Sequence, residues 1–330
     1  MSVFIIAEAG VNHNGSLSDA IRLVDIAIEA KVDAVKFQTF IAENISTVFA
    51  KKAKYQDRDL TSKSQIEMLK KLELSFEDQK ILFDYCKEKK IKFLSSPFDI
   101  QSVDFLVNLG LNIIKIPSGE ITNLPYLSYI GKLNKKLILS TGMSNILEIT
   151  EALRVLTTSG TQLNDITLLH TTSMYPAPLK DLNMNVITTL KNTFKTDVGY
   201  SDHSEGIDIP LIAVSLGSKV IEKHFTIDKN MHGPDHKASL SPRELKDMVK
   251  KIRLTEKALG SFDKKPTDGE IANLDIVRKS IVAAKDIKIG EEFSIDNITT
   301  KRPGNGISPM EWNNIIGKKS TKNYNIDDLI

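Results

Sequence analysis

Short apolar runs alternate with amphipathic segments over the first 260 residues of the chain. Each run begins with apolar residues and ends with polar ones, as expected for parallel strands whose two faces are covered. The predicted strands span residues 3–10, 34–40, 92–98, 113–119, 137–143, 166–173, 197–203 and 220–226. Helices are predicted over 17–30, 146–156 and 242–259, the last with Ser241 as its cap and Pro242 in its first turn.

Eight strand–helix units in about 250 residues are the number and size of a (β/α)8 barrel, or TIM barrel. An open doubly wound sheet is the alternative, but no G-x-G-x-x-G motif follows the first strand, which argues against a dinucleotide-binding sheet. Residues 41–74 are too long for an ordinary connection, and we expect a loop there with one short helix.

The remainder of the chain differs in character from the barrel. Residues 1–262 are assigned to the barrel, 263–277 to a polar linker that contains Pro and Gly, and 278–330 to a small α+β domain. In that domain we expect a strand over 280–284, a helical turn over 294–298 and a short helix over 307–316.

The composition excludes several functional classes. The 44 basic and 42 acidic residues give a net charge of +2, so no basic excess points to nucleic acid. No apolar run approaches the ~18 residues of a membrane helix, and the first ten residues predict a strand and not a signal peptide. Cys86, the only cysteine, cannot form an internal disulfide and is expected to pack within a helix. We therefore expect a cytoplasmic protein that binds neither nucleic acid nor membranes.

Polar residues are concentrated at the ends of the predicted strands, where a (β/α)8 barrel places its active site. Cations and hydroxyls there are expected to converge on one cavity suited to a small anion such as phosphate or carboxylate. These residues are Lys36, Gln38, Lys115, Ser118, Ser140 and Ser201. Lys115 and Ser118 differ in strand parity, so Pro117 must mark a bulge or a strand end if both point inward. A Schiff-base role for one lysine is the alternative.

Two histidines end the last two predicted strands. His203 and His224 share parity with Ser201 and Glu222, so each pair should point to the same face. Two imidazoles leave coordination positions open, which favours a catalytic divalent metal over a structural one.

Arginine is scarce at the expected site. No arginine stands at any predicted strand end, and a barrel that binds two phosphorylated substrates would be expected to use one. We therefore expect one phosphorylated substrate and one that carries no phosphate.

Several short motifs together resemble those of the bacterial sialic acid synthase family, in the order in which that family has them. They are IAEAGVNHNG (6–15), VKFQT (35–39), SSPF (95–98), KIPSGE (115–120), STGM (140–143), YSDH (200–203), EKHFT (222–226), GPD (233–235) and KRPGNG (301–306). The resemblance covers essentially the whole chain. It implies a (β/α)8 barrel followed by an antifreeze-like (SAF) domain, in a domain-swapped homodimer.

The resemblance also implies an activity. It is the condensation of phosphoenolpyruvate with an unphosphorylated N-acetylated sugar, with release of phosphate by C–O cleavage. The sugar expected first is N-acetylmannosamine, which would give N-acetylneuraminate. A divalent metal, manganese or magnesium, would be held by His203 and His224. The sister activities, N,N'-diacetyllegionaminate synthesis from 2,4-diacetamido-2,4,6-trideoxymannose and pseudaminate synthesis, use the same motifs.

The family's functional positions map onto this sequence as follows. Phosphoenolpyruvate would be bound by Lys36, Ser96, Lys115, Ser118, Ser140, Ser201 and by Ser173, which stands where some members have asparagine. The sugar would contact Gln38, Tyr175, Asp235 and Arg302, the last from the partner's small domain. Lys36 and Lys115 would stabilise charge during the reaction, and either Glu8 or Glu120 would move protons.

Two readings from other classes are weaker. The tail alone resembles ice-binding antifreeze proteins, but a binding protein would not need two metal-site histidines and two anion-site lysines. A Schiff-base aldolase is disfavoured because the two lysines are accompanied by the histidine pair.

Overall fold

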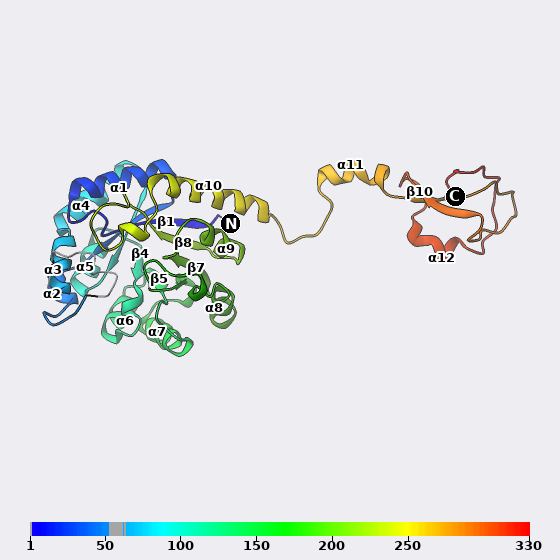
Figure 1. The fold of residues 1–330 in the computed structure, drawn as a ribbon. Helices are drawn as coiled ribbons and strands as arrows, with labels where there is room; N and C mark the ends of the chain where they lie inside the picture. The colour runs from blue at the N-terminus through cyan, green and yellow to red at the C-terminus, as the bar shows by residue number, and fades with distance from the viewer. Residues whose placement is uncertain (1, 53–61, 63) are drawn as a thin grey trace. The chain divides into compact units, whose positions relative to one another are not determined.

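The computed structural model describes residues 2–52, 62 and 64–330, and the chain divides into two compact units, Met1–Gly260 and Ser261–Ile330 (Figure 1). Within the predicted loop 41–74, residues 53–61 and 63 lie outside the described residues. This connection holds two short helices where one was expected, α2 (Ala42–Ile45) and α3 (Gln65–Leu72).

The first unit is built around a parallel sheet. Its strands are β1 (Phe4–Gly10), β2 (Ala34–Thr39), β3 (Lys92–Pro97), β4 (Ile113–Ile116), β5 (Lys136–Ser140), β6 (Ile166–Thr171), β7 (Asp197–Asp202) and β8 (Val220–His224). They are hydrogen-bonded in the order β3-β2-β1-β8-β7-β6-β5-β4, and β3 and β4 at the two ends of this order also lie in contact. The predicted (β/α)8 barrel is therefore confirmed, and the open doubly wound sheet is wrong.

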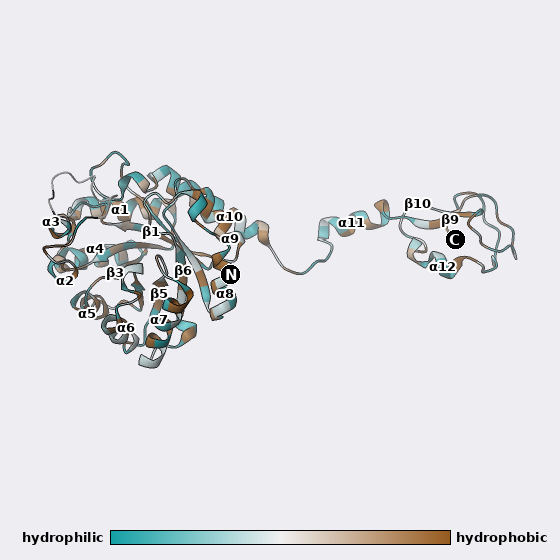
Figure 2. Ribbon diagram, turned by 60° about the horizontal axis from the view of Figure 1, so that its bottom comes forward, coloured by the Kyte–Doolittle hydropathy of each residue, from teal (hydrophilic) through white to brown (hydrophobic). Residues whose placement is uncertain are grey.

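Helices cover the outside of this barrel (Figure 1). Besides α2 and α3 they are α1 (Leu17–Ala30), α4 (Phe76–Glu88), α5 (Ile100–Asn108), α6 (Leu124–Gly131), α7 (Ile146–Ser159), α8 (Val186–Phe194), α9 (Asp208–Ser215) and α10 (Pro242–Leu259). Helix α10 begins with a capping box between Ser241 and Glu244 and buries one apolar stripe, which Figure 2 shows against its hydrophilic face.

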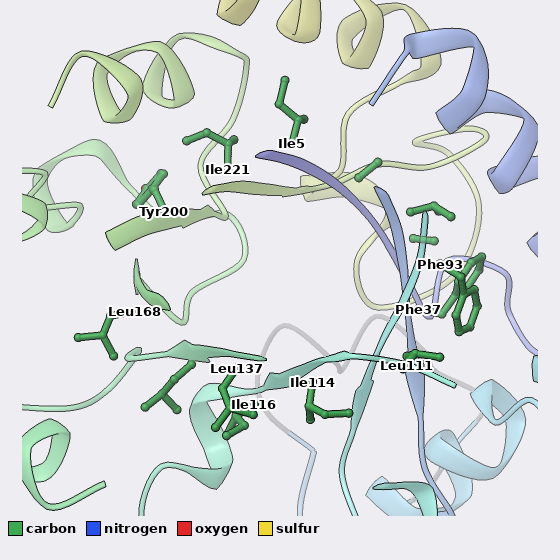
Figure 3. Close-up of a cluster of buried hydrophobic side chains, with 14 of the residues drawn as sticks. Ile5, Phe37, Phe93, Leu111, Ile114, Ile116, Leu137, Leu168, Tyr200 and Ile221 are labelled. Carbon is green, nitrogen blue, oxygen red and sulfur yellow. The ribbon is translucent and has the colours of Figure 1, made fainter. Parts of the chain in front are cut away.

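Side chains alternate between the two faces of each strand, and this alternation separates the core from the site. Side chains such as those of Ile5, Tyr200 and Ile221 point outward toward the helices (Figure 3). Inside the barrel a separate apolar layer is formed by Ile6, Ala34, Leu94, Ile138, Leu169 and Val220. Two residues further along each of these strands, the side chain that points inward is polar. The apolar layer therefore fills the barrel interior beneath a layer of polar side chains.

The second unit is small. It contains α11 (Asp268–Val277), an antiparallel pair of β9 (Ser280–Ala283) and β10 (Ile298–Lys301), and α12 (Trp312–Ile315). Its core is formed by Ile281, Ala283, Ile287, Phe293, Ile298 and Tyr324.

Of three local expectations for this region, two need correction and one is confirmed. The segment 263–277, expected to be an irregular linker, contains α11, because Thr267 and Glu270 form a capping box. The expected helical turn over 294–298 is present, because the Ser294 carbonyl accepts hydrogen bonds from Asn297 N and Ile298 N at 3.2 Å each, and strand β10 begins at Ile298. The expected helix over 307–316 is reduced to a 3-10 turn, Pro309–Glu311, followed by α12.

Candidate active site

Buried charges meet at the carboxyl ends of β1, β2, β4 and β8. Lys36 Nζ lies 2.7 Å from Glu8 Oε2 and 2.9 Å from Ser96 Oγ. Glu222 joins this group, because its carboxylate lies 3.6 Å from Lys36 Nζ and 3.5 Å from Lys115 Nζ. All four charged side chains are buried. The barrel therefore brings together the two lysines that were expected to bind an anion.

The charges in this cluster control one another's protonation. Burial by itself would raise the pKa of Glu222, but Lys115 and Lys36 lower it to about 2. Burial outweighs the attraction of Lys36 at Glu8, and the nearby Glu222 adds repulsion, so the pKa of Glu8 rises to about 7. Near neutral pH the Glu222 carboxylate is thus ionised, and Glu8 is a group that gains and loses a proton.

Glu222 is the site residue that sequence reasoning left out. Its position inside a strand, with the same parity as His224, was the available signal. It also accepts a hydrogen bond from Ser201 Oγ at 2.9 Å, so it orients a predicted anion-binding hydroxyl as well as the lysines.

A second group of hydroxyls lies beside β4, β5 and β6. Strand β4 ends at Ile116, before Pro117, and Ser118 begins the 3-10 turn Ser118–Glu120, which resolves the parity conflict with Lys115. Ser118 Oγ accepts from Gly142 N at 3.0 Å. A β-carbon on Gly142 would lie 2.3 Å from Ser173 Oγ and 2.8 Å from Ser118 Oγ, so only glycine permits this approach. Ser140, also expected to bind the anion, is buried at the end of β5.

The two predicted metal histidines lie together. The ring centroids of His203 and His224 are 5.6 Å apart, and the ring of Tyr175 lies 4.0 Å from that of His203. Asp235 Oδ2 lies 4.0 Å from His224 Nδ1, and burial raises the pKa of Asp235 to about 6. Two predicted sugar-contacting residues thus border the histidine pair.

Both imidazoles are suited to bind a cation. Burial lowers the pKa of His203 to about 4 and holds the pKa of His224 well below its ordinary value, so both rings are neutral near pH 7. His203 Nδ1 contacts the carbonyl of Thr172 at 2.8 Å, and because a carbonyl only accepts, Nδ1 carries the hydrogen and Nε2 has the lone pair. His224 Nδ1 is buried and has no hydrogen-bond partner among the residues that the structure describes. Within the described part of the chain, no group of three or more His, Cys, Asp or Glu side chains is placed to hold a metal.

Gly10 connects the charged cluster to the histidines. Its φ of +54° is in the left-handed region, and a β-carbon there would lie 3.3 Å from both Glu8 Oε1 and His224 Nδ1. The carboxyl group of Glu8, whose pKa is about 7, therefore lies beside the imidazole of His224.

Three predicted residues have other surroundings. Glu120 is partly exposed and accepts a hydrogen bond from Asn123 Nδ2 at 2.6 Å. Gln38 lies opposite Ser96 in the register of β2 and β3. Arg302 is exposed in the second unit, where its Nε donates to the carbonyl of Val277 at 3.0 Å.

Comparison with known families matches the chain in two places. The model of the NeuB family matches residues 23–264, which include all the buried site residues except Glu8 and Gly10. The chain belongs to the NeuB family. The model of the SAF domain matches residues 278–330, which confirms the expected C-terminal domain.

Individual relatives extend these matches over the whole chain. The chain is 57% identical over 327 residues to the N,N'-diacetyllegionaminic acid synthase of Campylobacter jejuni, covering 99% of this chain and 98% of that protein. It is 47% identical to the protein of the same name from Legionella pneumophila, covering 98% and 92%. The crystal structure of the sialic acid synthetase from Leptospira borgpetersenii superposes with a TM-score of 0.73 at 34% identity, covering 83% and 90%.

The relatives are sugar-acid synthases, so the chain is assigned to a family of enzymes. No helix among the described residues has the length and apolar character needed to cross a membrane.

Proposed function

We propose that this NeuB-family protein is an N,N'-diacetyllegionaminate synthase. It condenses phosphoenolpyruvate with 2,4-diacetamido-2,4,6-trideoxymannose and water, and it releases phosphate. The observation that carries the proposal is the juxtaposition of a buried two-lysine cluster with a neutral histidine pair at one end of the barrel. An anionic substrate and a carbonyl substrate can therefore meet there.

The choice of sugar rests on the relatives. Two proteins named for diacetyllegionaminate synthesis are 57% and 47% identical to this chain, whereas the sialic acid synthetase structure is 34% identical. These identities support the diacetamido sugar better than N-acetylmannosamine, which the motifs by themselves suggested.

Phosphoenolpyruvate is assigned to the lysine side of the site. Lys36 and Lys115 supply two positive charges, and the hydroxyl groups of Ser96 and Ser201 lie beside them, the former accepting from Lys36 and the latter donating to Glu222. The ordered carboxylate of Glu222 holds both ammonium groups before substrate arrives, so their charge is already oriented.

The sugar is assigned to the histidine side. His203 and His224 would hold a divalent ion, with Tyr175 and Asp235 beside them to contact the sugar. A bound manganese or magnesium ion would supply Lewis-acid polarisation of the aldehyde. The unpartnered nitrogen of His224 and the lone pair on His203 Nε2 are the donors that fit such an ion.

Glu8 is the proposed proton carrier, in preference to Glu120. Glu8 lies between the lysine cluster and His224, and its pKa of about 7 suits a group that both accepts and gives protons. Glu120 is partly exposed and hydrogen-bonded to Asn123.

The bond changes follow from this arrangement. C3 of phosphoenolpyruvate forms a bond to the aldehyde carbon, whose oxygen becomes the alkoxide of the new alcohol. Water adds to C2, and Glu8 takes one of its protons and delivers it to that alkoxide. The C2–O bond to phosphate then breaks, and the remaining hydroxyl at C2 passes its proton to the departing phosphate as the carbonyl forms.

Arg302 and the dimer are part of the proposal. Arg302 is the one arginine in a turn of the second unit, and a planar guanidinium can bind an acetamido carbonyl. We infer a swapped homodimer of a cytoplasmic enzyme in which this arginine reaches the partner's site.

Phosphate release with phosphoenolpyruvate and a panel of sugars tests the function. We expect release with the diacetamido sugar, loss of release in excess chelator, and recovery with added manganese. Faster release with a 6-phosphorylated sugar would contradict the assignment of one phosphorylated substrate. Full activity in excess chelator would contradict the metal site.

A further inference from the structure

A buried ion pair lies on the helix-facing side of β7 and β8. Lys223 Nζ is 2.5 Å from Asp202 Oδ2, the two residues are register partners, and both side chains are fully buried. They share strand parity with Tyr200 and Ile221, whose side chains Figure 3 shows pointing away from the barrel interior. An ion pair in such an apolar layer contributes little net stability, because desolvation of the two charges offsets their attraction.

This pair fixes the backbone around His203. Asp202 Oδ1 accepts hydrogen bonds from Ser204 N at 2.9 Å and from Ser204 Oγ at 2.7 Å, which forms an Asx turn with His203 at its centre. Lys223 Nζ also donates to the carbonyl of Ser204 at 2.7 Å. The chain is therefore held on both sides of His203 by one pair of charges.

The same pair reaches the second histidine. Lys223 immediately precedes His224 in β8, as Asp202 immediately precedes His203 at the end of β7. The ion pair thus joins the neighbours of the two imidazoles across adjacent strands. The carbonyl of Thr172 also orients the ring of His203. The distance between the two imidazole rings therefore depends on the Asp202–Lys223 ion pair.

We propose that Asp202 and Lys223 are positioning residues that hold His203 and His224 at the separation needed to bind one divalent cation together. The inference rests on the proposed metal site. Neither residue contacts the cation, and both act through the backbone. Groups hydrogen-bonded to metal ligands typically change metal affinity by about 10- to 100-fold, and we expect an effect in the same range from these residues.

The test removes both charges at once, so that no buried charge remains unpaired. In Asp202→Leu/Lys223→Met, manganese is titrated into the metal-free full-length protein, and free Mn²⁺ is followed by electron paramagnetic resonance. We expect the dissociation constant to rise about 10- to 100-fold. The midpoint of thermal unfolding of each metal-free protein is measured in parallel.

A matched control uses another ion pair of the same barrel. Arg253 Nη2 lies 2.6 Å from Asp33 Oδ2, next to the amino-terminal start of β2. The variant Asp33→Asn/Arg253→Met loses that pair, and we expect its manganese affinity to equal that of the unmodified protein even where its unfolding midpoint falls. Equal weakening of manganese binding in both double variants would overturn the proposal, because a general loss of stability would explain it.

Two further measurements keep the proposal refutable if the first double variant does not fold. Ser204→Ala removes only the hydroxyl bond to Asp202, and we expect a smaller loss of manganese affinity. In ¹⁵N-histidine spectra of metal-free Ser204→Ala protein, we expect faster exchange of the His203 Nδ1 hydrogen. Unchanged affinity and exchange would overturn the positioning role.

The outcomes separate this inference from the proposed function. If the unmodified protein binds no manganese, the metal site is wrong and the positioning role falls with it. If it binds manganese and the Asp202–Lys223 double variant binds it equally, only the positioning role is wrong.

Discussion

Replacement of Lys115 by methionine separates the two proposed subsites. The ammonium group of Lys115 is buried and lies 3.5 Å from Glu222 Oε1, so methionine keeps much of the side-chain shape and removes the charge. A charge-assisted hydrogen bond contributes about 1.5–3 kcal/mol, which corresponds to an increase of about 10- to 150-fold in the dissociation constant for phosphoenolpyruvate. The apparent affinity for the sugar should change much less.

The same change has an effect on the free protein. Glu222 keeps Lys36 and Ser201 as partners but loses one of the two cations that lower its pKa to about 2, so that pKa should rise. Removing one partner of a buried pair costs about 3–5 kcal/mol in the free energy of unfolding. Binding must therefore be measured well below the unfolding midpoint of Lys115→Met.

Calorimetric titration of phosphoenolpyruvate, together with the Michaelis constant for the sugar, gives the two quantities. Lys92→Met is the matched control, because Lys92 begins β3 at the opposite end of the barrel, where its Nζ lies 5.0 Å from the centroid of the Phe4 ring. It removes the same charge and should leave both affinities unchanged. Weaker sugar binding with unchanged phosphoenolpyruvate binding in Lys115→Met would show that the subsites are reversed.

Glu8, Gly142 and Arg302 give three separate predictions. Because the pKa of Glu8 in the free enzyme is raised to about 7 and the ionised form accepts the proton, kcat/KM should fall as the pH drops through about 7, and Glu8→Gln should lack this limb. A flat profile in the unmodified enzyme would contradict this role. Gly142→Ala places a β-carbon 2.3 Å from a hydroxyl oxygen and should lower activity about 100-fold, whereas Gly119→Ala, with no atom within 4 Å, should not. An equal mixture of Arg302→Ala and His203→Ala chains should recover about one quarter of full activity in a swapped dimer. Half of the dimers are then mixed, and each mixed dimer has one intact site of two. No recovery after verified subunit exchange would exclude the composite site.

The strand pattern was the most informative part of the sequence. A parallel strand covered on both faces is apolar until it reaches the site, so the change from Ile6 to Glu8, or from Ala34 to Lys36, marks both the strand and its active end. The amphipathic helices at 17–30 and 242–259 were predicted at their observed bounds because their caps are explicit.

Other features depend on distances that periodicity does not contain. Parity placed Glu222 on the inner face, but its approach to Lys36 and Lys115 comes from the closure of the barrel. Helix α11 was missed although Thr267 and Glu270 form its capping box, because the helix buries no side chain and its apolar pattern is weak.

A competition between two sugars tests the central claim most directly. The enzyme receives limiting phosphoenolpyruvate, manganese, and equal concentrations of 2,4-diacetamido-2,4,6-trideoxymannose and N-acetylmannosamine, and the products are quantified by mass spectrometry. Because both sugars compete for one site, the initial product ratio equals the ratio of their kcat/KM values. The account predicts that N,N'-diacetyllegionaminate predominates and that phosphate forms in equal amount to total product. Predominance of N-acetylneuraminate, or consumption of neither sugar, would contradict it.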